Sequence, residues 1–555
     1  MKRIVKQLLL YYLVFVLVKS IIAYIIPAPS AFSDEYIYVK LARSFFFNFD
    51  FTVHNIVSPV SNPLYFIAIS PAYLFNQMSV IYPVMKFINS IISSLVIFPS
   101  FLLAKEFFTS KGALKISVLI SLLPSNFILS SYILTENLFY PLFLFSIYFI
   151  YKSLTSERKI WPISAGIFVG LTYLSRIVGI ILFATLIILF LFKLLRREKT
   201  FLINIIIIFF ISFLIISPWF IINYLAQNNS LNNHISEAST IFELHKFLFK
   251  YLIQFILYLG ILIISAGIFF PMIISKKIFS KKILTFSILA ISSILFILII
   301  AANHNITAGP DAPIDLPAKY IPWLTGRLIG RYIDAVLPLV FLLGFICIKE
   351  EIKLKKTILY SSILFFSSQS VLSQLFPINH VSTAHIGVFN YLLLYLVKFP
   401  TNILITATIL AIIPFIFYKA KLTFKKVFLI FTIFLILLNL LNFTLIYYNS
   451  DKFWYKGDQM QLGIWMDSYD PKISTILFDK RDCTKDLRKL DQTTLCQPSG
   501  STTIIGFWLN DNIIISEPNN IKNVDFIISR HDLDLPLVKS SEDNIYIYST
   551  EEKRL

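Results

Sequence analysis

The sequence predicts an all-α polytopic membrane protein of about 13 transmembrane helices, followed by a small α/β domain outside the membrane. Of its 555 residues, 57% are hydrophobic and only 14% are charged, and the mean hydropathy is +0.75. Apolar stretches of about 20 residues, the length that crosses a hydrocarbon core, recur as far as Ser450. Beyond Ser450 charged side chains become frequent, as in a soluble domain.

Short and long loops alternate between the predicted spans. They are residues 4–26, 78–104, 112–131, 136–152, 160–175, 178–195, 201–222, 250–274, 282–301, 331–348, 356–375, 400–418 and 426–448. An odd number of spans places the N-terminus in the cytoplasm and the C-terminus outside. The first span is expected to stay as an anchor, because no small-residue cleavage site follows it. Segments 62–77 and 385–397 are shorter, and we expect both to lie on the outer surface.

The net charge of +18 is concentrated in short loops at alternate ends of these spans. The basic clusters lie at residues 2–6, 105–115, 152–159, 193–199, 276–282, 349–356 and 419–426. Cytoplasmic loops of membrane proteins are enriched in Lys and Arg, so this pattern explains the charge and excludes nucleic acid as a partner. The same loops are too short for a nucleotide-binding fold, and neither a Walker A nor a GxGxxG motif occurs. We therefore expect membrane lipids, and no nucleotide, as partners.

Two domains are expected, residues 1–448 in the membrane and 449–555 outside it. In the outer domain Ile464–Tyr469 closes a short helical pattern, and period-2 alternation predicts strands. The predicted strands are Thr475–Asp479, Ile513–Ser516, Val524–Ser529 and Ile545–Tyr548. Cys483 and Cys496 also lie there, where oxidation is permitted, and a disulfide is expected with two free thiols as the alternative.

Asp34 and Glu35 are adjacent carboxylates in the outer loop of residues 27–77, shortly after the first span. Charged groups close to membrane depth are costly and mark functional sites. The alternative is the start of a solvated helix, where acidic residues favour the helix dipole. Glu136 is a second acidic candidate, at the outer end where a helix returns into the membrane. It either faces Asp34 across an outer cavity or occupies the first turn of a helix that Thr135 caps.

Arg327 and Arg331 are four residues apart and share one face if the segment is helical. Guanidinium groups match the geometry of phosphate oxygens, and the Tyr332 hydroxyl adds a hydrogen-bond donor, so this face could bind a lipid phosphate. The alternative is general anchoring among anionic headgroups. Arg176, at another outer helix end, is a weaker phosphate candidate.

All the histidines and the longest loops fall on the outer side of this topology. Glu243 and His245, separated by one residue, are the one pair that suggests a metal site, against the alternative of ordinary surface groups. A divalent metal is therefore left open, and no cofactor is required.

These pieces, in this order, resemble the GT-C glycosyltransferases, especially the protein O-mannosyltransferase-like group that includes the 4-amino-arabinose lipid A transferase. The resemblance covers essentially the whole chain. The matching features are Asp34-Glu35 after the first helix, Asn62-Pro63-Leu64 at a surface helix, Glu136 after the third helix, Pro218-Trp219 at the end of the seventh, Arg331-Tyr332 with Pro338 at a late helix, and the small outer domain.

The resemblance implies an inverting transferase that uses a polyprenyl (dolichyl) phosphate-linked sugar, with its active site on the outer side of the cell membrane. Asp34 would be the general base for the acceptor hydroxyl. Arg331 and Tyr332, with Arg327, would stabilise the leaving phosphate. The basic residue expected just before the surface-helix proline is missing in this chain, where Asn62 precedes Pro63, so His54 or Arg176 would replace it.

Three rival functions make different predictions for the sequence. An oligosaccharyltransferase would carry spaced carboxylates in the first outer loop and a Trp-Trp-Asp motif, where this chain has adjacent carboxylates and Trp454-Tyr455-Lys456-Gly457. A flippase of lipid-linked glycans would favour charged spans and inverted repeats. A polysaccharide polymerase or ligase would have an outer loop richer in Arg and His.

Overall fold

The computed structural model describes the chain apart from sixteen segments, most of them short. They are residues 1, 31, 54–55, 58–61, 227–247, 282, 309–329, 349–352, 373–392, 394–395, 399–400, 421–422, 471–472, 483–500, 519–522 and 551–555. The chain divides into two compact units. The first comprises residues 1–15, 92–129 and 136–443, and the second comprises residues 16–91, 130–135 and 444–555.

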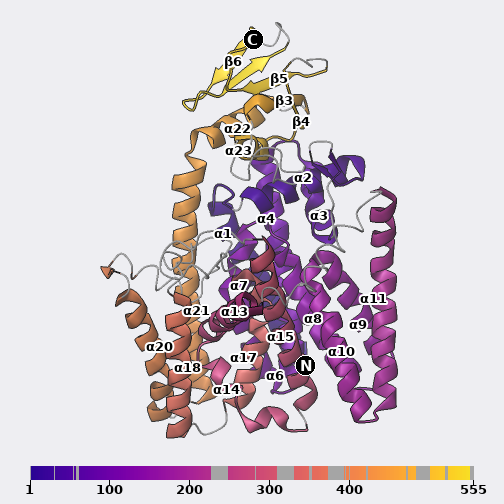
Figure 1. The fold of residues 1–555 in the computed structure, drawn as a ribbon, viewed down its shortest axis with the longest axis vertical. Coiled ribbons are helices and arrows are strands. Elements are labelled where there is room, and N and C mark those ends of the chain that lie inside the picture. The colour runs from indigo at the N-terminus through magenta and orange to yellow at the C-terminus, as the bar shows by residue number, and fades with distance from the viewer. Residues whose placement is uncertain are drawn as a thin grey trace. The chain divides into compact units, whose positions relative to one another are not determined.

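The first unit is helical throughout its described residues (Figure 1). Three helices run from one unit into the other: α1 (Lys2–Ile25), α4 (Met78–Ser94) and α21 (Phe424–Asn449). The remaining helices are α5 (Ile97–Lys105), α6 (Ser110–Ser121), α7 (Pro124–Phe127), α8 (Glu136–Ser153), α9 (Ile160–Ser175), α10 (Ile181–Leu195), α11 (Lys199–Ala226), α13 (Leu248–Ala266), α14 (Phe269–Met272), α15 (Leu284–Ala308), α16 (Arg331–Asp334), α17 (Leu337–Cys347), α18 (Leu354–Leu372) and α20 (Thr401–Ala420). Short 3₁₀ turns occupy Leu129–Ser131, Ile177–Ile180 and Lys276–Phe279.

The predicted helical membrane region is confirmed in outline. Among the described residues, 7 helices are long and apolar enough to cross a membrane, or up to 8 if one bent pair counts as a single span. Four shorter apolar helices accompany them, at Leu64–Leu74, Ile160–Ser175, Tyr251–Ala266 and Leu337–Cys347. The number of 13 spans and the orientation of the termini stay predictions.

Three of the predicted continuous spans are broken, each at a residue with a backbone reason. The segment 112–131 bends by 75° between α6 and α7, because Pro124 drives Leu123 into an extended conformation. The segment 250–274 breaks at Gly267, whose φ of 55° ends α13. In the segment 331–348 a turn separates α16 from α17, and Pro338 occupies the first turn of α17.

The predicted span 201–222 corresponds to α11, which continues through Pro218 to Ala226, whereas the family resemblance placed Pro218-Trp219 at the helix end. A proline inside a helix removes the hydrogen bond to the carbonyl four residues earlier, here that of Leu214. The hydroxyl of Ser217 donates to this same oxygen at 3.3 Å. The carbonyl keeps a partner, which makes the proline tolerable within an apolar helix.

Small residues let α9 pack closely on α11, and the two helices stand side by side with α8 and α10 (Figure 1). A Cβ at Gly166 would lie 2.6 Å from Ile211 Cβ, and one at Gly170 would lie 2.8 Å from Ile215 Cβ. The Ser212 hydroxyl donates to the Gly166 carbonyl at 3.1 Å. Small residues four positions apart are typical of helices that associate in lipid, where close packing takes the place of the hydrophobic effect.

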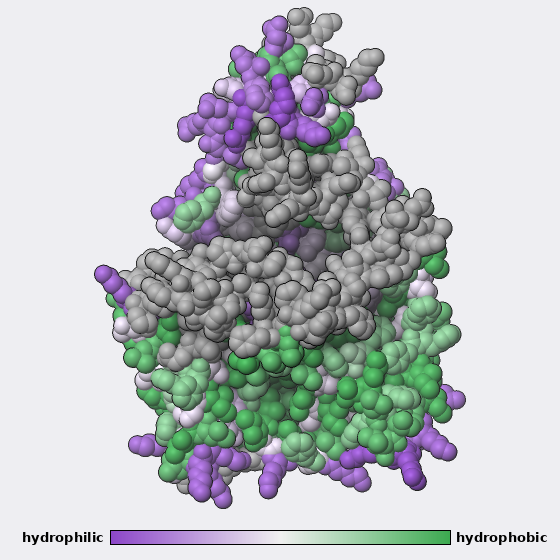
Figure 2. Space-filling view, viewed as in Figure 1, coloured by the Kyte–Doolittle hydropathy of each residue, from purple (hydrophilic) through white to green (hydrophobic). Residues whose placement is uncertain are grey.

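The surface of the first unit is a broad apolar band with hydrophilic side chains gathered along its lower edge (Figure 2). Leucine, isoleucine and phenylalanine side chains of α10, α11, α20 and α21 are exposed over this band. A soluble protein rarely exposes so large an apolar surface, whereas lipid tails solvate it.

The second unit combines residues 16–91 and 130–135 with the C-terminal region. Its helices are α2 (Phe32–Asn48), α3 (Leu64–Ile69), α22 (Asp458–Tyr469) and α23 (Ser501–Phe507), with 3₁₀ turns at Ser70–Leu74 and Lys480–Asp482 and a π-helical turn at Ser450–Tyr455. Its strands are β1 (Thr52–Val53), β2 (Ile56–Val57), β3 (Thr475–Asp479), β4 (Asn512–Ser516), β5 (Phe526–Ser529), β6 (Leu537–Ser540) and β7 (Tyr546–Ser549). The expected short helix at 62–77 is present as α3 and the following turn. The other expected surface segment, 385–397, lies almost wholly outside the described residues.

The predicted C-terminal sheet is confirmed, with one strand more than expected. Its order is β4-β3-β5-β7-β6, with β3 parallel to β4 and β5, and β7 antiparallel to β5 and β6. Ile476 and Phe478 pack in the core that the sheet forms with α22 and α23 (Figure 1), whereas Leu477 belongs to a cluster on the opposite face. Strand β3 is therefore buried on both faces of the sheet.

Candidate functional site

A buried cluster in the first unit gathers several predicted site residues. Glu136, 1% exposed, begins α8 and forms an ion pair with Arg176 Nη1. Its Oε1 also lies 3.4 Å from Arg331 Nε. The side chains of Arg176 and Arg331 are only 13% and 11% exposed. Two guanidinium groups are thus held close together by one carboxylate, and the three charged groups sum to one positive charge.

Aromatic side chains complete this cluster. The Arg176 guanidinium lies over the Tyr332 ring at 5.0 Å from its centroid, a favourable cation–π geometry. The ring of His304, near the end of α15, lies 4.8 Å from that of Tyr332. The Tyr140 hydroxyl donates to the Arg331 carbonyl at 3.0 Å and fixes the start of α16 against α8.

The local sequence explains how these residues meet. Arg176 follows the last residue of α9 in an extended conformation, and a 3₁₀ turn comes next. A Cβ at Gly179, inside that turn, would lie 2.9 Å from the Thr172 backbone, so the turn needs a glycine. Because α8 and α9 pack as an antiparallel pair, the start of α8 and the end of α9 lie at one end of the hairpin.

The other end of this hairpin is the basic loop that contains Arg158 and Lys159. An α-helix rises 1.5 Å per residue, so the 18 residues of α8 separate the two ends by about 27 Å. The cluster therefore lies at the helix ends opposite a loop of the kind found in the cytoplasm.

The adjacent carboxylates belong to the second unit and differ in their surroundings. Asp34 lies in the first turn of α2 and is partly exposed. Glu35 is fully buried, and its carboxylate accepts hydrogen bonds from the Ser30 amide at 3.2 Å and the Ile133 amide at 3.0 Å. Glu35 thus holds together two backbone segments, which is a structural task that the sequence did not reveal.

Other contacts fix the chain that leads into α2. The Lys86 ammonium, 2% exposed, donates to the Ile26 carbonyl at 2.8 Å and lies over the Tyr82 ring. The Ser450 hydroxyl accepts from the Ala28 amide at 3.0 Å and donates to the Ala28 carbonyl at 2.7 Å. A lysine in an apolar helix was the available signal for Lys86, whereas nothing in the sequence pointed to Ser450.

Several predicted residues lie outside the described part of the chain: Arg327, Glu243, His245, His54 and the cysteine pair Cys483 and Cys496. Within the described residues no group of three or more His, Cys, Asp or Glu could hold a metal ion. Sequence reasoning missed Tyr140 and His304, since a tyrosine or histidine near a helix end is common and carries no distinctive spacing.

The comparisons with known proteins agree with this fold. Residues 61–222 match the family described as dolichyl-phosphate-mannose-protein mannosyltransferase. No curated protein sequence matches the chain. The crystal structure of ArnT from Cupriavidus metallidurans bound to undecaprenyl phosphate aligns over 98% of both chains, with 12% identity and a TM-score of 0.56.

The apo state of the same ArnT aligns over 97% of both chains, with 13% identity and a TM-score of 0.55. The apo oligosaccharyltransferase of Archaeoglobus fulgidus covers 94% of this chain and 69% of its own, at 14% identity and a lower TM-score of 0.44. The resemblance to GT-C glycosyltransferases is therefore confirmed by a family match and by the ArnT fold. With its apolar helices, the chain is a multi-pass membrane protein.

Proposed function

We propose that the protein is an inverting glycosyltransferase that moves a sugar from a polyprenyl phosphate carrier to an acceptor hydroxyl. The observation that carries the proposal is the gathering of Arg176 and Arg331 around one buried carboxylate in an apolar helical unit. The family description names dolichyl-phosphate-mannose, and the ArnT structure contains undecaprenyl phosphate. Both names fit a lipid phosphate as the ligand of this cluster.

The two arginines would act on the leaving group. As the bond between the anomeric carbon and the phosphate oxygen breaks, negative charge accumulates on the phosphate. Guanidinium groups that are already positioned stabilise that charge without reorganising. Tyr332 and Arg327, which lies outside the described residues, are the further donors in this proposal. Glu136 is a positioning residue that keeps Arg176 and Arg331 together.

Asp34 is the proposed general base. It would take the proton of the acceptor hydroxyl while the hydroxyl oxygen attacks the anomeric carbon from the face opposite the phosphate. The carbon–oxygen bond to the acceptor forms, the bond to the phosphate breaks, and the configuration inverts. Glu35 would position Asp34 by holding the Ser30 and Ile133 amides, which support the start of α2.

The site is proposed to lie on the extracytoplasmic side of the plasma membrane, with the N-terminus inside and the C-terminus outside. The charge asymmetry of the α8–α9 hairpin supports this orientation, since its basic loop and the arginine cluster occupy opposite ends. The orientation is tested by Lys480→Cys, which places a thiol at an exposed position after β3, with the parent chain as the control for its native cysteines. A membrane-impermeant thiol reagent should label this cysteine from the outer side. Labelling from the cytoplasmic side alone would contradict the orientation.

The function is tested by incubating the purified chain with a panel of polyprenyl-phosphate sugars and following their consumption by mass spectrometry. We expect one carrier class to be consumed, and Arg331→Gln to weaken donor binding about tenfold or more, since charge-assisted hydrogen bonds are strong. Arg158→Gln, in the exposed basic loop, removes the same charge and serves as the control. Failure of every carrier in the panel would overturn the proposal.

A further inference from the structure

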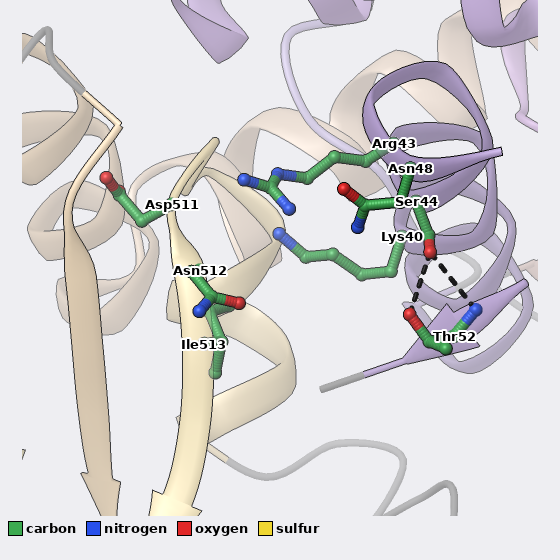
Figure 3. A pocket seen from close by; sticks show the side chains of 8 residues that line it. All are labelled: Lys40, Arg43, Ser44, Asn48, Thr52, Asp511, Asn512 and Ile513. Atoms are coloured by element: carbon green, nitrogen blue, oxygen red, sulfur yellow. Dashed lines mark hydrogen bonds between the residues drawn. The ribbon is translucent and has the colours of Figure 1, made fainter. Parts of the chain in front are cut away.

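A small polar pocket lies in the second unit between α2 and the edge strand β4 (Figure 3). It encloses about 330 Å³ of empty space, part of it open to solvent. The lining residues are Lys40, Arg43, Ser44, Asn48, Thr52, Asp511, Asn512 and Ile513.

One face of α2 supplies half of this lining. Lys40, Arg43, Ser44 and Asn48 follow the spacing of residues that share a helical face. Figure 3 shows the ammonium and guanidinium groups pointing across the pocket toward β4, where Asn512 lies. Two cations and two amides therefore converge on one small space.

The backbone around the pocket holds both cations in place. The Lys40 ammonium, on a residue 6% exposed, donates to the Leu509 carbonyl at 2.6 Å. Arg43 Nε and Nη2 donate to the Asn510 carbonyl at 3.2 and 3.1 Å. Among the described residues these bonds use Nε and Nη2, which leaves Nη1 for a ligand.

Hydroxyl groups form the wall opposite β4. The Ser44 and Thr52 hydroxyls are 2.7 Å apart, and both donate to the Asp50 carboxylate, which lies just beyond α2. The Asp50 charge is therefore taken up by these two donors, and Lys40, Arg43 and Asp511 are the charged residues of the lining.

We propose that this pocket binds an acidic saccharide. Lys40 and Arg43 bind its acid group, and Asn48 and Asn512 bind its hydroxyl groups. A guanidinium fork matches the oxygens of a carboxylate or a phosphate. Amide side chains both donate and accept, as sugar hydroxyls require. The inference rests on the proposed function, in which such a saccharide would be the acceptor or a neighbouring unit of it.

The charge of the pocket changes near neutral pH. Burial lowers the pKa of Lys40 to about 7, further lowered by Arg43 and partly restored by Asp511 and Asp467. Burial also raises the pKa of Asp511 to about 7, with Asp470 raising it and Lys40 and Arg43 lowering it. Below this pH Lys40 is charged and Asp511 is neutral, and above it the reverse holds. The pocket therefore favours an anion more strongly at pH 6 than at pH 8.

The test is a ligand-observed NMR titration of the full chain in detergent, without any donor. The probes are trigalacturonate for a carboxylate and mannose 6-phosphate for a phosphate, with trigalacturonate methyl ester and mannose as their neutral controls. We expect at least one acidic probe to bind and its neutral control to bind at least tenfold more weakly. Binding of neither acid, or equal binding of acid and neutral control, would overturn the inference.

Two variants locate the binding. Asn512→Asp places a negative charge in the pocket, and Arg43→Gln removes a positive one, so each should weaken acid binding about tenfold or more. Lys480→Gln removes a charge from the exposed turn after β3 and should leave binding unchanged. Binding that survives both pocket variants would refute the site. If an acid binds but no sugar is transferred, the pocket inference stands and the proposed transferase function fails. If sugar is transferred but no acid binds, the proposed function stands and the pocket inference fails.

Discussion

Replacing Glu136 by glutamine should destabilise the first unit strongly. The carboxylate is 1% exposed, and it neutralises part of the charge of Arg176 and Arg331, which are 13% and 11% exposed. Glutamine keeps the size of the side chain but leaves both guanidinium groups without a counter-charge from this position. Breaking a buried ion pair by removing one partner typically costs about 3–5 kcal/mol. In this cluster the cost should fall toward the lower value, because the arginines keep some contact with solvent.

The assay is thermal unfolding of the detergent-solubilised chain, with Glu136→Gln/Arg176→Gln as the matched double variant. The double variant restores the original sum of charges, so it should recover part of the lost stability. It should nevertheless stay defective in donor binding, since one guanidinium of the proposed phosphate site is gone. A Glu136→Gln protein as stable as the parent would refute the ion-pair reasoning. A double variant no more stable than the single one would show that the loss does not come from unbalanced charge.

Four further predictions concern other parts of the chain. Asp34→Asn should slow transfer by about 10²–10⁴-fold, the usual contribution of a general base, while donor binding, measured by titration, should stay unchanged. Glu35→Gln should chiefly lower thermal stability, because two backbone amides lose their charged acceptor. Gly170→Leu should lower the melting temperature by forcing α9 away from α11. The control Lys159→Leu, at an exposed position, should leave the melting temperature unchanged. Because the folded-state pKa of Asp511 is raised to about 7, the folded state keeps this proton longer than the unfolded state, so the contribution of Asp511 to stability should fall as pH rises from about 4 to 7. Asp511→Asn should flatten this fall in a series of melting curves.

Much of the fold could be predicted because membrane helices and exposed sheets leave periodic traces in a sequence. The strand Thr475–Asp479 matches β3 residue for residue, and the helix predicted at 160–175 matches α9. The strand β6 was missed, since Leu537–Ser540 is short and ends in Lys and Ser. The breaks at Pro124 and Gly267 were missed because apolar composition continues across them and hides a change in backbone direction.

The site was harder to predict than the helices. The sequence separates Glu136, Arg176 and Arg331 widely, and their ion pairs were not predicted. Glu136 was expected either to face Asp34 or to occupy the first turn of a helix, and the two arginines were expected to bind a lipid phosphate. The task of Glu35 could not be predicted, because its partners are backbone amides, and every residue except proline supplies one.

The surroundings of the proposed base depend on residues from both ends of the chain. Ser450 holds the Ala28 backbone just before α2, and Lys40 in the middle of α2 donates to Leu509. Asp467, in α22, accepts from the Met78 amide at 2.8 Å at the start of α4. Removing the residues after 448 would therefore deprive α2 and α4 of these hydrogen-bond partners. The C-terminal region thus contributes hydrogen bonds that hold the Ala28 backbone and α2, the helix that carries Asp34.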